Sequence, residues 1–220
     1  AAVKEKSIMV APQYSTFIYS PNILTGSGKI FKKTEGGELI SQNDHILIKS
    51  TSALKKDQVI TIVSKIQDIT KGTDPAGYLY RITGIARVEE VQNDIVKAIV
   101  TYSIQEARVG SVIFDDIAPI KPMALALTEP GSVSASIIDF HGGIQGSSTN
   151  DLVFLNVGKT QGIDKGAVLN VAVKTELDDA GMKGETVVFK DYIGIVVVLQ
   201  SLDDSSMALV VESKVLIEKG

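Results

Sequence analysis

The chain has 220 residues, of which 44% are hydrophobic and 22% charged, with a formal net charge of −4 and no cysteine. This composition supports a folded core, which excludes a disordered tail. The negative charge argues against nucleic acid or anionic lipid as partners, and the lack of cysteine excludes disulfides, Cys-bound zinc and a thiol nucleophile.

Neither end of the chain nor its hydropathy indicates a membrane segment. The longest apolar run, residues 193–199, is far shorter than the roughly 20 residues that a membrane-spanning helix needs. The chain starts with Ala1-Ala2-Val3, without an initiator Met or a signal pattern. We therefore expect a trimmed N-terminus and a chain that is part of a longer protein.

Residues 1–24 are predicted to be an N-terminal extension, in which the aromatic and β-branched segment 14–19 forms a strand. A first β module is predicted at residues 25–120. Its strands are expected at 45–49, 59–64, 78–88 and 95–103. In the last strand, the alternation predicts one buried face made by Val96, Ala98, Val100 and Tyr102.

One segment of this module also fits a helix. Ile62, Ile66 and Ile69 have helical spacing, and Gly72 suits a helix end, so a short helix over residues 62–72 is the alternative to a strand. Residues 74–77, Asp-Pro-Ala-Gly, are predicted to form a turn because proline fixes its own φ.

Prolines mark the middle of the chain. Pro119, Pro122 and Pro130 argue against a continuous helix and predict an extended connector, which we assign to residues 121–130. A second β module is predicted at residues 131–220. Its strands are expected at 152–157, 167–173, 193–199 and 207–212, and the charged segment 174–190 is expected to be an exposed hairpin or long loop.

The two modules resemble each other. Residues 28–48 align without gaps on residues 135–155, and Ile30, Gly36, Ser41, Asn43 and Asp44 recur as Ile137, Gly143, Ser148, Asn150 and Asp151. Further along, residues 54–59 align with 163–168, and Asp94, Ala98, Val100, Ser103 and Gly110 recur as Asp204, Ala208, Val210, Ser213 and Gly220. We predict an all-β protein of two tandem homologous modules, each a small barrel or sandwich, that arose by internal duplication.

Few side chains suggest catalysis or metal binding. The only histidines are His45 and His141, and neither recurs at the equivalent position of the other module. Asp139 and His141 form an Asp-x-His pair, but a metal site needs further ligands, so a surface turn is the favoured interpretation. No Gly-x-Ser-x-Gly motif is present. The glycine-rich segments 26–28 and 142–146 lack the Lys-Ser/Thr of a phosphate loop and are interpreted as turns.

Acidic residues occur in four adjacent pairs. Neighbouring residues of a strand point to opposite faces, so these pairs are interpreted as solvated turn residues and not as paired catalytic carboxylates. The pairs are Glu89-Glu90, Asp115-Asp116, Asp178-Asp179 and Asp203-Asp204. The recurring Asn43-Asp44 and Asn150-Asp151 are expected to fix the turn that enters a strand. We predict no catalytic, cofactor-binding or metal-binding residues.

Several strand and turn motifs carry a family resemblance. They are Asp74-Pro75-Ala76-Gly77-Tyr78, Ala98-Ile-Val100-Thr-Tyr-Ser103 and Tyr192-Ile-Gly194 followed by Ser206-Met-Ala208-Leu-Val210 and Ser213. This order resembles the C-terminal region that follows LysM domains in the secretin-associated protein of type IV pili. It is also similar to the C-terminal module of the flagellar outer-ring T protein. The resemblance covers about residues 26–220. It departs from the family at turns that are usually Gly-Asp, where this chain has Lys56-Asp57, Lys165-Gly166 and Gly110-Ser111.

The resemblance implies a non-catalytic module in the periplasm, beside an outer-membrane secretin or flagellar ring. It also implies a longer protein that reaches peptidoglycan through a LysM domain absent from this chain. From the residues themselves, the loop 174–190 is the favoured contact, because it is charged and lacks a counterpart in the first module. The alternatives are a carbohydrate- or small-ligand-binding module that uses a barrel mouth, and an envelope hydrolase whose site gathers residues distant in sequence.

Overall fold

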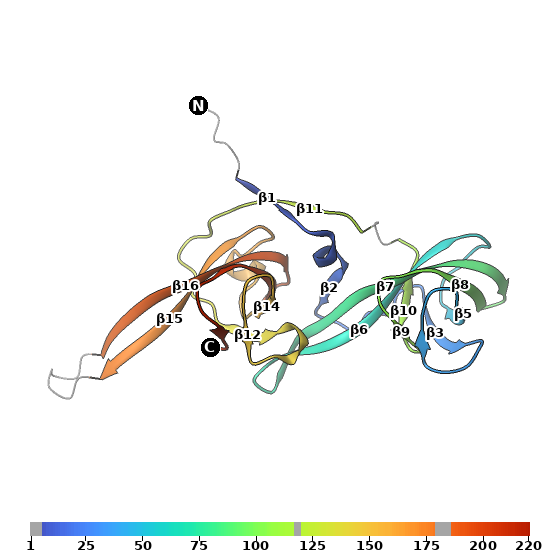
Figure 1. Ribbon diagram of the computed structural model, residues 1–220, viewed down its shortest axis with the longest axis horizontal. Coiled ribbons are helices and arrows are strands. Elements are labelled where there is room, and N and C mark those ends of the chain that lie inside the picture. The colour runs from blue at the N-terminus through green and yellow to red at the C-terminus, as the bar shows by residue number, and fades with distance from the viewer. Residues whose placement is uncertain (1–5, 117–119, 179–185) are drawn as a thin grey trace, which may run out of the picture. The chain divides into compact units, whose positions relative to one another are not determined.

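The computed structural model describes residues 6–116, 120–178 and 186–220, and its regular structure is almost entirely strands (Figure 1). The predicted all-β fold is confirmed. The chain separates into two compact units. The first comprises residues 9–68 and 77–123, and the second comprises residues 69–76 and 124–220 with the residues before Met9. Each unit contains its own apolar core.

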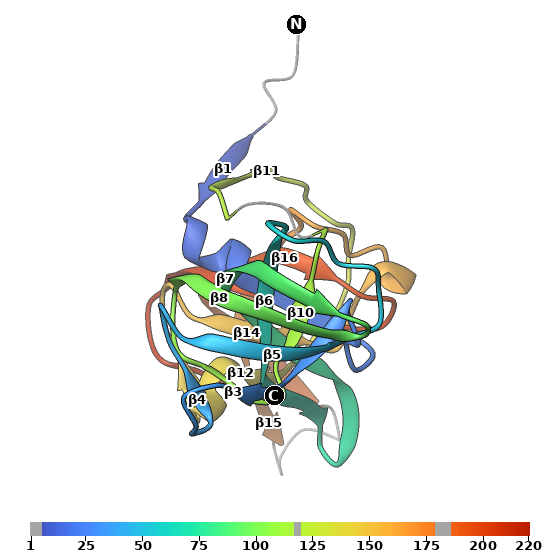
Figure 2. The same cartoon turned by 90° about the vertical axis from the view of Figure 1, so that its right-hand side faces the viewer.

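The first unit contains a closed barrel of six strands. Their order is β7-β6-β10-β3-β5-β8, and β8 pairs back onto β7 (Figure 2). The strands are β3 (Gly28–Lys33), β5 (His45–Ser50), β6 (Val59–Lys71), β7 (Asp74–Gln92), β8 (Ile95–Ser103) and β10 (Val112–Phe114). The short strand β10 lies between β3 and β6 and is antiparallel to both. Strand β2 (Phe17–Ser20) extends the sheet beside β7.

Alternating apolar residues fill this barrel, as the period of a half-buried strand requires. Ile46 and Ile48 of β5 face the same core as Val96 and Ala98 of β8, and none of the four is exposed. Ile113 of β10 is buried in this core as well. Closure through β10 therefore gives the barrel both a continuous ladder and a sealed interior.

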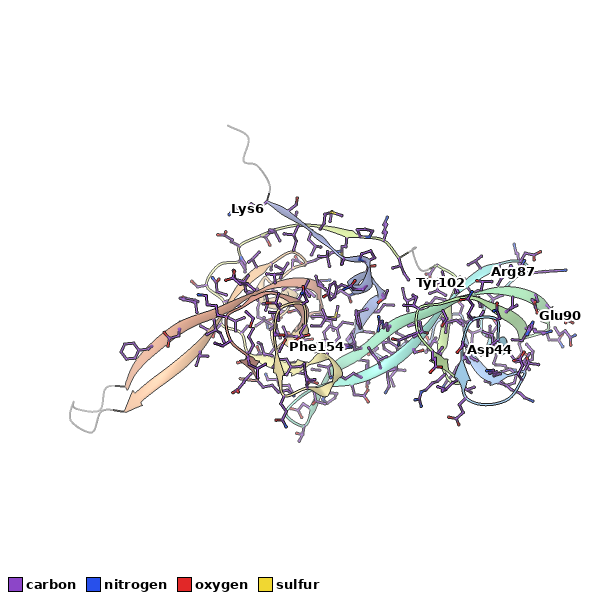
Figure 3. The ribbon with its side chains drawn as sticks, in the orientation of Figure 1. Lys6, Asp44, Arg87, Glu90, Tyr102 and Phe154 are labelled. Atoms are coloured by element: carbon purple, nitrogen blue, oxygen red, sulfur yellow. The ribbon has the colours of Figure 1, made fainter. Side chains whose placement is uncertain are left out.

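The second unit contains a five-stranded sheet in the order β12-β14-β17-β16-β15. The strands are β12 (Ile137–Phe140), β14 (Leu152–Leu155), β15 (Val168–Asp178), β16 (Thr186–Ser201) and β17 (Ser206–Ser213). Every residue of β14 is buried, including Phe154, which is labelled in Figure 3. Strands β12 and β15 are the two edges of this sheet.

Short elements complete the described fold. Three two-stranded sheets are formed by β1 (Ser7–Val10) with β11 (Met123–Ala126), by β4 (Leu39–Ile40) with β9 (Ala107–Arg108), and by β13 (Gly146–Ser147) with β18 (Ile217–Glu218). Short 3-10 segments occupy Pro12–Thr16, His141–Gly143 and Lys159–Gln161.

The predicted strands are confirmed in both units, which rejects the alternative helix, but two other local predictions are wrong. The alternative helix over 62–72 is absent because β6 runs as a strand to Lys71, where pairing with β7 satisfies its backbone. The turn predicted at 74–77 lies instead around Gly72, whose φ of 64° suits a tight turn, and residues 74–77 begin β7. The strand predicted at 14–19 starts at Phe17. Ahead of it, the Ser15 and Thr16 hydroxyls donate to backbone carbonyls and favour a 3-10 turn.

One expectation about exposure is wrong and one about a loop is confirmed. Tyr102 was expected on the buried face of β8 but is 54% exposed (Figure 3), because the β7–β8 register shifts between Ile85 and Ala86. Segment 174–190 was expected to be an exposed hairpin or long loop, and its described residues belong to the β15–β16 hairpin. The tip of this hairpin, residues 179–185, lies outside the described residues. The predicted internal duplication stays a prediction.

Candidate functional site

The recurring Asn-Asp steps have the local role that was predicted. Asn43 and Asn150 have left-handed φ values of 72° and 76°. The next carboxylates accept backbone hydrogen bonds, from Ser41 to Asp44 over 2.7 Å and from Ser148 to Asp151 over 2.8 Å. The Asp44 and Asp151 amides also donate back to the Ser41 and Ser148 carbonyls, over 3.2 and 3.1 Å. Each step therefore closes a β-turn that leads into a strand, and its carboxylate is engaged by the turn.

His45 lies in a group of charged side chains on the outside of the closed barrel. Its Nδ1 is 2.9 Å from Glu35 Oε1, and its Nε2 is 3.6 Å from Glu89 Oε2. Lys97 Nζ is also 3.6 Å from Glu89. The hydrogen bond from His45 lowers the pKa of the Glu35 carboxyl. These contacts are partly exposed to solvent, and among the described residues no group of His, Asp and Glu is arranged to hold a metal ion.

The Asp139–His141 pair does not form a metal edge. Asp139 lies in β12 and is only 7% exposed, which contradicts its predicted place in a surface turn. Its carboxylate accepts a hydrogen bond from Lys219 Nζ over 2.7 Å and another from the Phe140 amide. His141 begins the 3-10 segment that follows β12. Asp139 is thus satisfied by an ammonium and an amide, which agrees with a structural role.

The acidic doublets were interpreted as solvated turn residues. Residues 115–116 and 203–204 lie in bends, as expected, but Glu89 and Glu90 lie inside β7, which contradicts the turn interpretation for that pair. Asp115 accepts from the Ser27 hydroxyl, and Asp204 accepts from the Thr160 hydroxyl, each over 2.7 Å. Glu90 is exposed and accepts from Gln92. Asp179 lies outside the described residues.

One surface feature stands out in the second unit, which we call the arm. It is the part of the β15–β16 hairpin that extends beyond β17, since β17 pairs with β16 only from Gly194 onward (Figure 1). Three large side chains of the arm are exposed: Val173 by 48%, Phe189 by 53% and Tyr192 by 60%. Thr175 pairs with Phe189, so Val173 and Phe189 lie on one face of the arm.

The opposite face of the arm combines an aromatic ring with cations. Ala172 pairs with Tyr192 and Lys174 pairs with Lys190, which places Tyr192 beside two lysines. All three of these side chains are exposed. Asp191 pairs with Val173 and is exposed as well, so the first face combines two apolar side chains with a carboxylate, and the opposite face carries Tyr and Lys.

A groove of about 460 Å³ is the second feature of this unit. It lies between the edge strands β12 and β15 and is lined on those two sides by Ser136 and Ile137 and by Leu169 and Val171. The C-terminal Gly220 also lines it, and the Gly220 amide donates to the Ile137 carbonyl over 3.2 Å. Sequence reasoning missed the groove, because the two edges that form it come together only in the folded sheet.

The described residues contain no helix with the length and hydropathy needed to cross a membrane. No protein-family model matches the chain, and no curated protein matches its sequence. The family resemblance therefore stays a prediction carried by the strand and turn motifs.

Proposed function

We propose that this chain is a non-catalytic periplasmic scaffold module that contacts an outer-membrane secretin or a flagellar ring. It would act as part of a longer protein that reaches peptidoglycan through a LysM domain outside this chain. The observation that carries the proposal is the arm with its exposed Val173, Phe189 and Tyr192. The motif resemblance supplies the choice of partner and compartment.

The composition of the arm supports contact with protein. Aromatic side chains are enriched in protein interfaces because they bury a large area with few rotatable bonds. Covering an exposed Phe with a partner stabilises the complex by about 25 cal/mol per Å² of apolar area that is buried. Lys174 and Lys190 beside Tyr192 add charge that would orient an acidic partner surface.

Site-specific photo-crosslinking in native envelopes tests the proposal. A benzophenone amino acid replaces Phe189 in one variant and Phe31 in a matched control, since Phe31 lies in β3 of the first unit and is 46% exposed. The crosslinked partners are identified by mass spectrometry. We expect a secretin or flagellar ring protein from position 189 and none from position 31. Recovery of peptidoglycan fragments alone, or equal crosslinking from both positions, would contradict the proposal.

A carbohydrate- or small-ligand-binding module is the second candidate, and the groove of about 460 Å³ is the observation in its favour. Its volume falls in the range of about 300–1,000 Å³ that is usual for ligand pockets. The groove is lined by aliphatic and polar residues and contains none of the aromatic rings on which sugars commonly stack. Calorimetric titration with cell-wall glycan fragments distinguishes the candidates, because only the second predicts saturable heat.

A further inference from the structure

The closed barrel of the first unit contains a pocket of about 530 Å³ at strands β3 and β5. Two lysines line it, Lys29 from β3 and Lys49 from β5. Phe31, Thr51 and Val109 are further lining residues. The volume falls within the range of about 300–1,000 Å³ that is usual for small-molecule pockets.

The two lysines are directly opposite each other in the β3–β5 ladder, and both side chains are exposed. Opposed residues point to the same face, and like charges in this arrangement destabilise a sheet. Lysines often protect the open edge of a sheet. Here β3 pairs with β5 and β10, and β5 pairs with β3 and β8, so neither strand is an edge (Figure 2). Edge protection therefore does not explain the lysine pair.

The two ammonium groups are not neutralised equally. Lys49 forms an ion pair with Asp94, and the hydrogen bond from Lys49 lowers the pKa of the Asp94 carboxyl. In the ranges that the structure describes (6–116, 120–178 and 186–220), Lys29 has no ion-pair partner. Two positive charges and one negative charge leave this side of the pocket with a net charge of +1.

This charge balance indicates the class of ligand. One carboxylate neutralises the excess charge, whereas a phosphate monoester carries about −1.5 to −2 at pH 7 and would add to a chain whose net charge is already −4. An ammonium has three N–H donors, so Lys49 can keep Asp94 while it donates to a ligand oxygen. The neighbouring Phe31 is 46% exposed and offers apolar surface to the rest of the ligand.

We propose that this pocket binds a small carboxylic acid with an apolar body. The carboxylate accepts hydrogen bonds from Lys29 and Lys49, and the apolar body covers Phe31 and Val109. Charge-assisted hydrogen bonds of this kind are stronger than neutral ones, and the bound anion also relieves the repulsion between the opposed lysines. The inference uses residues of the first unit alone. It is independent of the proposed scaffold role and of the groove in the second unit.

Titration of the isotope-labelled full chain with 4-phenylbutyrate, followed by amide NMR, tests the pocket. We expect saturable shifts at residues 28–31, 49–51 and 109–110 and none in β14 of the second unit. The uncharged analogue 4-phenylbutyramide should bind at least about tenfold more weakly, because it lacks the anionic acceptor. Equal binding of acid and amide would overturn the proposal. So would the absence of saturable shifts at millimolar concentration of the acid.

A matched pair of variants, Lys29→Met and Lys32→Met, tests the role of the unpaired ammonium. Both lysines are exposed on β3, but only Lys29 lines the pocket. Methionine keeps the apolar stem and removes the charge. Lys29→Met should weaken 4-phenylbutyrate binding at least about tenfold, and Lys32→Met should leave it within about twofold of the parent. Lys29→Arg, which keeps the charge, should retain binding. Equal affinities of the two Met variants would overturn the proposal.

Thermal unfolding gives a second measurement of the same site. A ligand that binds only the folded chain stabilises it, so 4-phenylbutyrate should raise the unfolding midpoint of the parent and not that of Lys29→Met. The midpoint shift of the parent should shrink when the salt concentration rises to about 0.5 M, because salt screens exposed charges. A midpoint shift that depends neither on Lys29 nor on salt would show that the pocket takes up the ring without binding the carboxylate, and would overturn the proposal.

Discussion

Asp44 combines a turn and an ion pair at one carboxylate (Figure 3). It accepts from the Ser41 amide and from Lys33 Nζ, each over 2.7 Å. Burial alone would raise the pKa of this carboxyl, but the Lys33 ammonium and the Ser41 amide outweigh burial and hold the pKa below its ordinary value. Ionised Asp44 is therefore better stabilised in the folded chain than in the unfolded chain.

The first prediction follows from the sign of this shift. A carboxyl whose pKa is lower in the folded chain than in the unfolded chain stabilises the fold fully at pH values above its ordinary pKa. This stabilisation is lost as the pH falls below about 4 and through the pKa of the folded chain. Asp44→Asn should be less stable than the parent by about 1–2 kcal/mol at pH 7, because a charge-assisted bond is lost. The difference should shrink below about pH 3. Urea unfolding at both pH values measures the difference in stability. Lys33→Met, which removes the other member of the ion pair, is the control. An equal difference at both pH values would contradict this account.

Substitutions at two glycines of one loop distinguish the cost of backbone strain from the cost of steric overlap. Gly162 and Gly166 both have left-handed φ values, of 75° and 92°. A Cβ at Gly162 would meet nothing within 4 Å, whereas a Cβ at Gly166 would lie 2.1 Å from the Ala126 carbonyl oxygen. Gly162→Ala should destabilise by about 1–2 kcal/mol and Gly166→Ala by at least about 3 kcal/mol. Comparable losses in chemical denaturation would show that the Ala126 contact is unimportant.

At the scale of the element, strand pairing determines how much a neighbouring core residue contributes to the free energy of unfolding. Ile60 of β6 is 1% exposed next to the residues that pair with β10, whereas Leu169 of the edge strand β15 is only partly buried and lines the groove. Ile60→Ala should lower the free energy of unfolding by about 3–4 kcal/mol, and Leu169→Ala should lower it by about 1–2 kcal/mol. Denaturant midpoints of the two variants provide the test. A loss at Leu169 as large as that at Ile60 would mean that the groove is closed in solution.

Sequence patterns predicted the strands well because alternation depends only on which face meets the core. The limits of β8 were predicted correctly, and Asn43-Asp44 was correctly interpreted as a turn. The pattern failed where long-range pairing decides the outcome. Helical spacing in residues 62–72 was overridden by the β7 ladder, and the exposure of Tyr102 follows from a register shift. The groove could not be predicted, since its lining combines residues of β12, β15 and the C-terminal segment that come together only in the folded chain.

At the scale of the whole molecule, two separate cores predict two thermal transitions. Ile46 is completely buried in the core of the first unit, and Val153 is completely buried in that of the second. Ile46→Ala should lower the midpoint of one calorimetric transition and Val153→Ala that of the other, each by about 10 °C or more, since such a truncation costs at least about 2 kcal/mol and each kcal/mol lowers the midpoint by about 4–8 °C. A single transition that both substitutions lower equally would show that the units unfold as one cooperative body.

The position of β10 late in the first unit also has a consequence for synthesis. Val112 pairs with Lys29, so closure joins segments that leave the ribosome far apart in time. Until β10 has emerged, the nascent chain exposes the edges of β3 and β6 and the apolar residues beneath them. Contacts of such high sequence separation form slowly and leave partly folded chains open to association. During translation, the barrel of the first unit thus stays open at one seam until its last strand has been made.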